Sequence, residues 1–410
     1  MLLLKEYMPA FLCCLYRSCH CRHCQLFDAI TGNGANFKQP AFGLILVIHL
    51  FMETRDVIGL EKSEKTFKPW MPKRVLFTPD ALEESYGQEI LSRIKEHGIP
   101  FEILKANRLT NLRGKDERET YRLAKTTLAV VKAPPSQLRL QPIPPSADWQ
   151  FHLAQGCPAH CQYCYLAGSL SGPPVIRVYA NLPAILENLP NYTEAGKLTT
   201  FEASCYTDPL SLEHLTGGLQ KTISFFAALP GAQLRFVTKF TAVQPLLPLQ
   251  HNGHTRARIS LNAPEVARRL EGGVPNIEAR IKALGQLALP QDKGGGGYPV
   301  GIVLAPIIPI QNWEEHYKTL LSKIGEALHA APDVTFELIT HRFTEGSRSL
   351  LQEWYPNTSL DMTEENRSRK LNKFGGTKYV YNRDVMKALK DFFYAEIPEQ
   401  LPQAKILYWT

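Results

Sequence analysis

After residue 145 the sequence contains six short runs rich in β-branched, aromatic and leucine residues, with stretches of helical character between them. The runs are "WQFHLAQ", "LTTFEASC", "QLRFVTKF", "RARISLNA", "PVGIVLAP" and "DVTFELIT". Strands that alternate with helices in this way form a parallel sheet. Six units predict an α/β fold with a partial (β/α)6 barrel similar to a TIM barrel, over residues 146–345. An open doubly wound sheet is the alternative.

The segments on either side of this barrel have weaker patterns. Residues 67–145 predict a small N-terminal α/β subdomain, with strands at "KRVLFT" and "PFEIL" around the helix "PDALEESYGQEILSRIKEHG", followed by a polar and proline-rich linker. Residues 346–410 predict a basic hairpin around Gly375 and Gly376, then a helix and the strand "AKILYW". The run "QDKGGGGYP" precedes a strand, so it predicts a flexible turn rather than a phosphate loop.

The first 66 residues differ from the rest, and we expect a poorly ordered extension there. Their run "CCLYRSCHCRHC" offers thiolates and imidazoles that could bind zinc, and an upstream start with the working protein beginning near Met52 is another interpretation. The apolar run "AFGLILVIHLFM" is shorter than the roughly 20 residues of a membrane span. We therefore expect no membrane association.

Composition narrows the class of protein. A hydrophobic fraction of 44% and a charged fraction of 21% are typical of a globular chain and exclude wholesale disorder. The formal charge of +7 slightly favours an anionic partner such as nucleic acid. Nine cysteines in two tight groups argue against a secreted disulfide framework and for metal or redox chemistry in a reducing compartment, so we expect a cytoplasmic protein.

The chemistry-bearing residues follow the predicted strands, where both candidate folds form their sites. The strand ends carry a three-cysteine loop, Cys205 with Asp208, Lys239, Ser260 with Asn262, Ala305, and His341 with Arg342. An ordinary ion pair explains Asp208 and Lys239 in structural terms. A polar pair that caps a strand explains His341 and Arg342 as well.

The three-cysteine loop, "GCPAHCQYCYLAGS", places Cys157, Cys161 and Cys164 within eight positions and has no fourth cysteine nearby. Structural zinc usually takes four ligands in two pairs, and His160 abuts Cys161, so it would have difficulty turning to the same ion. A four-iron cluster held by three thiolates keeps one iron open to a substrate or cofactor.

This spacing, with Tyr163 just before the last cysteine, resembles the cluster loop of radical S-adenosylmethionine enzymes. The resemblance implies a [4Fe-4S] cluster whose open iron chelates the amine and carboxylate of S-adenosyl-L-methionine. An electron from the cluster then splits the sulfonium and produces a 5′-deoxyadenosyl radical.

A longer series of motifs resembles one family, the spore photoproduct lyases, from about Phe67 to the C-terminus. The motifs are "GCPAHCQYCYL", "IRVYANL", "FEASCYTD", "HLTGGL", "LRFVTKF", "HNGHTRARISLN", "APIIPIQNWEEHY" and "FELITHRFT". The resemblance implies a carbon–carbon lyase that repairs UV-damaged DNA by reversing the thymine dimer 5-thyminyl-5,6-dihydrothymine to two thymines. It also implies an electron donor such as flavodoxin or ferredoxin, and we expect a monomer.

The resemblance assigns roles residue by residue. Cys157, Cys161 and Cys164 would bind the cluster, and Cys205 would donate a hydrogen atom to the thymine radical. Tyr163 and Tyr165 would lie near the substrate and the radical path. The residues that would contact the cofactor or frame its pocket are Thr207, Asp208, Lys239, Ser260 and Ala305. A buried small side chain explains a lone Cys205 structurally, and packing explains the two tyrosines.

Between Asn366 and Arg383 basic residues alternate with aromatic ones and no acid intervenes. Such a hairpin suits a phosphate backbone and an exposed base, although a solvated charged face is the usual alternative. The residues expected to contact DNA are Arg369, Lys370, Lys373, Phe374 and Lys378. Lys373 and Phe374 replace an Arg-Tyr pair common in the family, which weakens the lesion assignment.

Two other functions therefore stay open. One is a related radical enzyme that acts on a different pyrimidine lesion or nucleic acid. The other is a metal-stabilised nucleic-acid-binding protein without radical chemistry.

Overall fold

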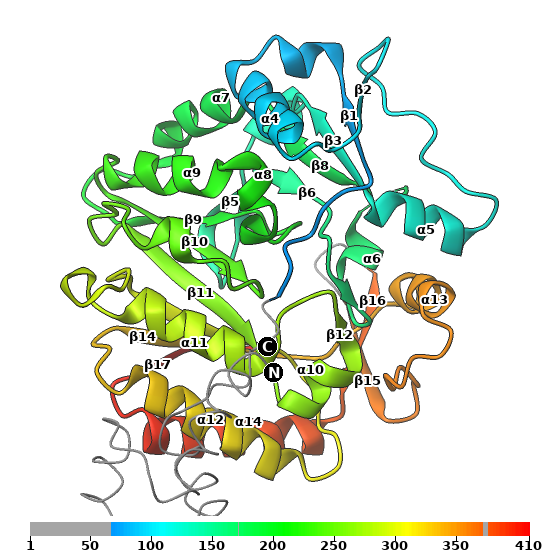
Figure 1. Cartoon of the computed structure of the whole chain (residues 1–410). Coiled ribbons are helices and arrows are strands. Elements are labelled where there is room, and N and C mark those ends of the chain that lie inside the picture. The colour runs from blue at the N-terminus through cyan, green and yellow to red at the C-terminus, as the bar shows by residue number, and fades with distance from the viewer. Residues whose placement is uncertain (1–66, 171, 372–375) are drawn as a thin grey trace, which may run out of the picture. The chain divides into compact units, whose positions relative to one another are not determined.

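The computed structural model describes residues 67–170, 172–371 and 376–410 (Figure 1). Phe67–Thr410 form one compact unit. The expectations for residues 1–66, including the Cys/His run and a start near Met52, concern residues outside the described part. The same holds for Lys373 and Phe374 of the hairpin.

The larger sheet has eight strands in the order β17-β14-β13-β11-β10-β9-β5-β4. Its six predicted strands are all present and parallel: β5 (Ala147–Phe151), β9 (Thr199–Ala203), β10 (Ala232–Thr238), β11 (Thr255–Leu261), β13 (Val300–Ile307) and β14 (Val334–Thr340). The strand order never reverses, as it does at the switch point of a doubly wound sheet. The partial barrel is therefore confirmed, and the alternative is wrong.

Both edges of this sheet carry an extra strand. β17 (Lys405–Trp409) pairs parallel with β14, and β4 (Gln141–Ile143) pairs antiparallel with β5. β17 is the predicted final strand. Because β4 and β17 are not paired with each other, the barrel stays open on that side.

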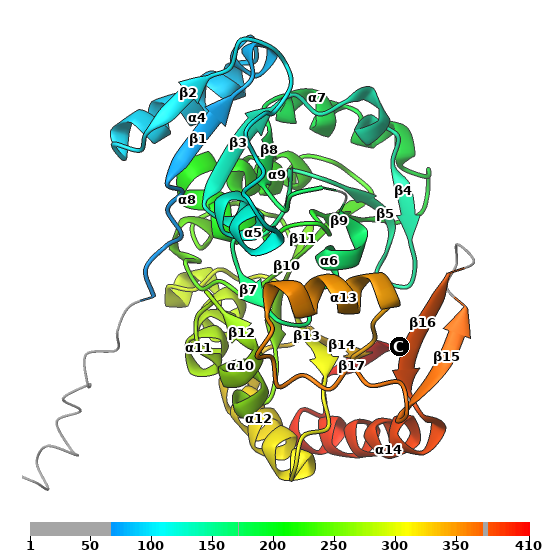
Figure 2. The same ribbon diagram turned by 90° about the vertical axis from the view of Figure 1, so that its right-hand side faces the viewer.

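Helices cover the outer face of the curled sheet (Figures 1 and 2). They are α7 (Leu182–Glu187), α8 (Glu213–Thr216), α9 (Gly218–Ala227), α10 (Pro264–Leu270), α11 (Ile277–Ala288), α12 (Trp313–Leu328) and α14 (Arg383–Gln400). In α11, Ile277, Ile281 and Leu284 recur at helical spacing and are buried. The side chain of Asn276 accepts a hydrogen bond from the Ala279 amide at 2.8 Å and caps this helix.

A second sheet, in the order β2-β1-β3-β8-β6, forms the N-terminal part of the unit. Its strands are β1 (Arg74–Phe77), β2 (Phe101–Ile103), β3 (Thr127–Val131), β6 (Ala154–Gln155) and β8 (Ile176–Tyr179). Strands β6 and β8 come from beyond the predicted boundary at residue 145. The division into subdomains stays a prediction, and the sheet draws on both sides of it.

Two local predictions in this part were wrong. The polar stretch expected to be a linker contains α5 (Glu117–Lys125), which is capped by Asp116 and buries Thr120, Tyr121 and Ala124. Its buried face was hidden because five of its nine residues are charged, including the buried Lys125. The predicted helix from Pro79 to Gly98 is divided into a 3-10 turn, η1 (Pro79–Leu82), and α4 (Ser85–Glu96).

Shorter elements complete the fold. They are α6 (Leu166–Ser169), α13 (Glu345–Trp354), the ladder of β7 (His160–Cys161) and β12 (Glu271–Gly272), and the 3-10 turns η2 (Pro135–Leu138), η3 (Leu189–Tyr192), η4 (Pro209–Leu212), η5 (Gln244–Leu246) and η6 (Gln291–Lys293). The predicted basic hairpin is present as β15 (Arg367–Leu371) and β16 (Thr377–Tyr381). Figure 2 shows it next to α13 and the start of α14.

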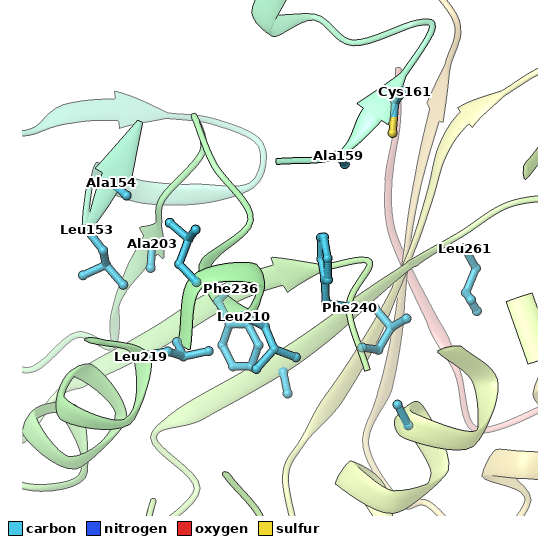
Figure 3. Close-up of a cluster of buried hydrophobic side chains, with 14 of the residues drawn as sticks. Leu153, Ala154, Ala159, Cys161, Ala203, Leu210, Leu219, Phe236, Phe240 and Leu261 are labelled. Atoms are coloured by element: carbon cyan, nitrogen blue, oxygen red, sulfur yellow. The ribbon is translucent and has the colours of Figure 1, made fainter. Parts of the chain in front are cut away.

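One hydrophobic core extends from the sheets to the cysteine loop. Figure 3 shows Leu153, Ala203 and Phe236 in this core, with Cys161 at its upper edge. Burial of a side chain such as Phe236 stabilises the fold by about 1.5–3 kcal/mol. Among the described residues, no helix has the length and apolar character that crossing a bilayer requires.

Candidate active site

The three cysteines of the loop line one pocket and are free thiols. Cys161 is buried in β7, and Cys157 and Cys164 are half-buried. Within the described residues, no group of three His, Cys, Asp or Glu side chains is arranged to hold a metal ion. The three thiols offer the donor set of a four-iron cluster that keeps one iron open.

The backbone of this loop is held from two directions. On one side, β12 pairs antiparallel with β7, so that Glu271 lies opposite Cys161. On the other side, the Lys125 ammonium of α5 donates hydrogen bonds to the carbonyl oxygens of Cys157 and Ala159. Gly156 begins the loop with φ +81°, and a Cβ there would lie 2.5 Å from the carbonyl oxygen of Val175.

The thiols lie in a mostly desolvated environment. Burial raises the pKa of Cys157 to about 12 and that of Cys161 to about 11. The Lys125 ammonium opposes the rise at Cys157, and the Lys239 ammonium opposes it at Cys161. Thiols beside two cations suit an iron–sulfur group, whose irons would hold the sulfurs as thiolates.

Lys239 directly follows β10, and its ammonium turns towards the cysteine loop. It donates to Tyr163 Oη at 2.6 Å and to Glu271 Oε1 at 2.7 Å, while Arg280 pairs with the other Glu271 oxygen at 2.6 Å. Burial alone would raise the pKa of Glu271, but these two cations and Tyr163 lower it to about 2. The alternative interpretation of Lys239 and Asp208 as an ion pair is wrong, because the Lys239 ammonium pairs with Glu271.

Asp208 is instead held by three protein donors. Its carboxylate accepts hydrogen bonds from Thr238 Oγ1 at 2.6 Å, from the Lys239 amide at 2.7 Å and from the Ser211 amide at 3.3 Å. Burial outweighs these bonds and raises its pKa to about 6. Thr207 donates its hydroxyl hydrogen to the carbonyl oxygen of Gly156. Asp208 thus links the segment after β9 to the end of β10, and Thr207 links it to the cysteine loop.

The remaining expected cofactor residues lie on adjacent strands. Ser260 is on β11 and Ala305 is on β13, its parallel neighbour. The Arg280 guanidinium that pairs with Glu271 also donates to the Ser260 carbonyl oxygen at 3.2 Å. The strand ends and the cysteine loop thus share one buried polar network.

Cys205 follows β9, and Tyr165 of the cysteine loop donates its hydroxyl hydrogen to the Cys205 carbonyl oxygen. The structure therefore brings together two residues that lie 40 positions apart. Burial raises the pKa of the Cys205 thiol above its ordinary range, and the Glu202 carboxylate adds to the rise. The thiol accordingly keeps its hydrogen at neutral pH, as a hydrogen-atom donor must.

The hairpin carries positive charge on both faces, because Arg369 and Lys370 are successive residues of β15. Lys370 lies directly opposite Lys378 in the β15–β16 ladder, an arrangement of like charges that destabilises a ladder without an anion. Burial, helped by Arg342 and Lys370, lowers the pKa of Lys378. The Arg369 guanidinium lies 5.6 Å from the centre of the Tyr379 ring.

His341 and Arg342 have separate surroundings. His341 is buried, and its Nδ1 and carbonyl oxygen contact the Arg367 guanidinium at 3.2 Å and 3.1 Å. Arg342 is exposed, near Lys378. His341 supports the base of the hairpin, which agrees with the structural explanation of this residue.

Sequence reasoning missed several residues of the site. Glu271 and Arg280 belong to the region after β11, and Lys125 belongs to the stretch predicted to be a linker. Tyr121 and Tyr355 line the cysteine pocket and contact each other through their hydroxyls. None of these residues has a motif, and only the tertiary fold brings them to the cysteines.

Comparisons with known proteins agree on one family. A family model described as "Spore photoproduct lyase" matches residues 70–410. The chain is 38% identical to spore photoproduct lyase of Bacillus subtilis over 347 residues, which cover 83% of this chain and 99% of the relative. It is 37% identical to the enzyme of a Geobacillus species, with 84% and 100% covered.

Solved structures give the same match. The structure of spore photoproduct lyase complexed with dinucleoside spore photoproduct has a TM-score of 0.78, is 37% identical and covers 84% of this chain and all of its own. A variant of that enzyme with bound AdoMet and dinucleoside spore photoproduct also has a TM-score of 0.78, at 36% identity and the same coverage.

Proposed function

The chain belongs to the spore photoproduct lyase family and is a lyase, and we propose that it uses S-adenosyl-L-methionine to reverse the spore photoproduct in DNA to two thymines. The observation that carries this proposal is the contact between Tyr165 of the three-thiol loop and Cys205. This contact joins the cysteine loop to the main chain of Cys205, whose thiol is the proposed hydrogen donor. Complexes of a relative with AdoMet and with the lesion support it.

Two sets of residues would hold the cofactors. Cys157, Cys161 and Cys164 would hold a [4Fe-4S] cluster. The wall of the S-adenosylmethionine pocket would comprise Thr207, Asp208, Lys239, Ser260 and Ala305. When bound, the cluster and S-adenosylmethionine supply a carbon-centred radical that takes a hydrogen atom from C6 of the lesion.

Cys205 acts after the bond between the two thymines has broken. The S–H bond of Cys205 breaks, a C–H bond forms on the thymine allyl radical, and a thiyl radical stays on the sulfur. A thiolate has no hydrogen atom to give, so the burial that raises the pKa of this thiol serves the reaction. Tyr163 and Tyr165 would line the path by which the thiyl radical is reduced.

Lys125 and Lys239 would place positive charge beside the cysteines that hold the cluster. Each ammonium opposes the rise in pKa of one buried cysteine. Lys125 also donates to two carbonyl oxygens of the loop. It therefore holds the backbone of the loop in place and also supplies a positive charge there. We regard both lysines as positioning residues.

The basic hairpin would hold the DNA. Arg369, Lys370 and Lys378 offer cations to the phosphate backbone, and a target base must leave the duplex to reach Cys205. The same role is proposed for Lys373 and Phe374. A small acidic protein such as flavodoxin or ferredoxin would supply the electron. We further propose a monomer, and a cytoplasmic location, since the described cysteines are free thiols as in a reducing compartment.

Two linked assays test the function. Reconstituted, reduced protein should cleave S-adenosylmethionine to 5′-deoxyadenosine and convert dinucleotide spore photoproduct to thymidylyl-thymidine. Absence of cleavage, with zinc bound in place of iron, would contradict the radical chemistry and favour a nucleic-acid-binding protein. Cofactor cleavage beside an intact lesion would point to another pyrimidine lesion or nucleic acid.

A further inference from the structure

A polar cavity lies beside the Cys205 loop and shares no lining residue with the cysteine pocket. Its volume is about 180 Å³, and it is lined by Ser136, Gln137, Arg139, Gln141, Gln150, His152 and Tyr206. Pockets that enclose a whole drug-sized ligand measure about 300–1,000 Å³. This cavity therefore has room for one base or one phosphate group.

The inner wall of the cavity is a pair of stacked rings. His152 lies 4.8 Å from Tyr206, centre to centre, with 27° between the ring planes. His152 is only 9% exposed, and its Nδ1 is buried with no hydrogen-bond partner in the described part of the chain. Burial lowers the pKa of His152 to about 4, so the imidazole is neutral at physiological pH. A buried polar atom of this kind needs a partner.

The backbone fixes these rings next to Cys205. The Ser204 amide donates to the Phe151 carbonyl oxygen at 2.7 Å, and the Leu153 amide donates to Ser204 Oγ at 3.0 Å, one bond on each side of His152. The Gly156 amide binds the Tyr206 carbonyl oxygen at 2.8 Å. The carbonyl of Tyr206 thus faces the cysteine loop, while its side chain faces the cavity.

The outer wall is polar and positively charged. Gln141 of β4 lies directly opposite Gln150 of β5, and the exposed Arg139 precedes β4. Among the described lining residues Arg139 is the only charged one, so the cavity favours an anion or a neutral polar ring over a cation. Amides, an imidazole and an arginine are the groups that bind base edges and phosphates.

Tyr206, which lines the cavity, directly follows Cys205 in the chain, so the cavity lies beside the proposed hydrogen donor. We propose that this cavity is a subsite for the nucleotide next to the lesion, whose base contacts His152 and the glutamines and whose phosphate contacts Arg139. The inference rests on the proposed function and adds to it a contact between the protein and a nucleotide outside the two thymines of the lesion.

The test compares two substrates in variants of the cavity. Arg139→Ala changes an exposed residue, and His152→Phe keeps a ring against Tyr206 while it removes the nitrogens. Repair is measured on the lesion as a dinucleotide and in the middle of a pentanucleotide. Arg268→Ala is the matched control, because it removes an exposed arginine whose partner is Glu265 on the same helix.

We expect each cavity variant to lose about tenfold in kcat/KM on the pentanucleotide and less than about twofold on the dinucleotide, as loss of a charged or buried hydrogen bond predicts. Equal losses on both substrates, or no loss on the pentanucleotide, would overturn the subsite. If the wild type repairs neither substrate, the proposed function fails. Binding of an undamaged pentanucleotide then decides the subsite: weaker binding by both variants supports it, and unchanged binding rejects it.

Discussion

Glu271 lies directly opposite Cys161 in the ladder of β7 and β12, and its carboxylate is the common partner of Lys239 and Arg280. One buried acid thus joins the backbone of a proposed cluster ligand to the end of β10 and to α11. The side chain of Glu271 has no exposed surface. Its removal would leave two cations in a desolvated site.

We expect Glu271→Gln to lower the free energy of unfolding by about 3–5 kcal/mol, because a buried pair loses one partner. Less iron should be retained after reconstitution, since β7 loses its anchor. Urea unfolding and iron analysis measure the two effects. Glu265→Gln, in the exposed pair with Arg268, is the control and should change neither. Normal stability and full iron content in the Glu271 variant would refute the anchoring role.

The same residue predicts a pH dependence. The pKa of Glu271 is lowered to about 2 in the folded chain, against about 4.3 for an unperturbed glutamate. Its stabilising effect is therefore complete above the unfolded value and is lost as the pH falls through the folded value. The stability difference between the wild type and Glu271→Gln should shrink as the pH falls from about 5 towards 2. A difference that stays constant over this range would contradict the linkage.

Cys205→Ala should separate cleavage of the lesion from clean repair. The variant keeps the cysteine loop, so it should still form 5′-deoxyadenosine and break the bond between the thymines. The thymine radical then lacks its hydrogen donor and should be diverted into side products, which mass spectrometry of the reaction mixture would detect. Clean conversion to thymidylyl-thymidine by this variant would reject the assignment of Cys205.

Lys125→Met should make the proposed cluster harder to reduce. The variant removes a positive charge beside Cys157 and keeps the length of the side chain, so the reduced, more negative state loses stabilisation. We expect about a tenfold lower ratio of reduced to oxidised cluster at a fixed potential, which equals about 59 mV for one electron. A redox titration followed by EPR measures it, and Lys125→Arg should restore most of the shift. An unchanged midpoint would leave Lys125 with a purely structural role.

Lys370→Ala and Lys378→Ala should each weaken DNA binding without destabilising the fold. Each removes a cation that would neutralise a phosphate, so the slope of log affinity against log salt should decrease by about 0.9 in each variant. Each also relieves the like-charge pair, so the thermal midpoint should stay the same or rise. Lys323→Ala, which breaks the exposed ion pair between α12 and Glu278, is the control. Unchanged DNA binding in both variants would place the DNA elsewhere.

The strands of the barrel were predictable because each is a compact run of apolar residues flanked by polar turns. α5 was not, since its charged residues outnumber the few side chains that it buries. Within the site, Cys157, Cys161 and Cys164 indicated three thiolate ligands for one cluster. The resemblance to spore photoproduct lyases pointed to Cys205. Glu271 and Lys125 could not be found, because they contact the cysteine loop across 108 and 32 positions. Arg280 could not be found either, because it acts through Glu271 and has no contact of its own that a motif would mark. The cavity at His152 could not be predicted from the sequence either, because Tyr206, which stacks on His152, follows a different strand.

The cysteine loop lies between short strands that belong to different sheets. β6 enters it from the N-terminal sheet, β7 pairs with a segment about 110 residues later, and β8 returns the chain to the N-terminal sheet. Contacts between distant segments form late, because their loops cost entropy to close. We therefore expect the loop to take its shape only after both sheets have assembled. Iron would then be loaded onto a nearly finished protein, and a truncation at the start of the barrel would yield a chain that cannot receive it.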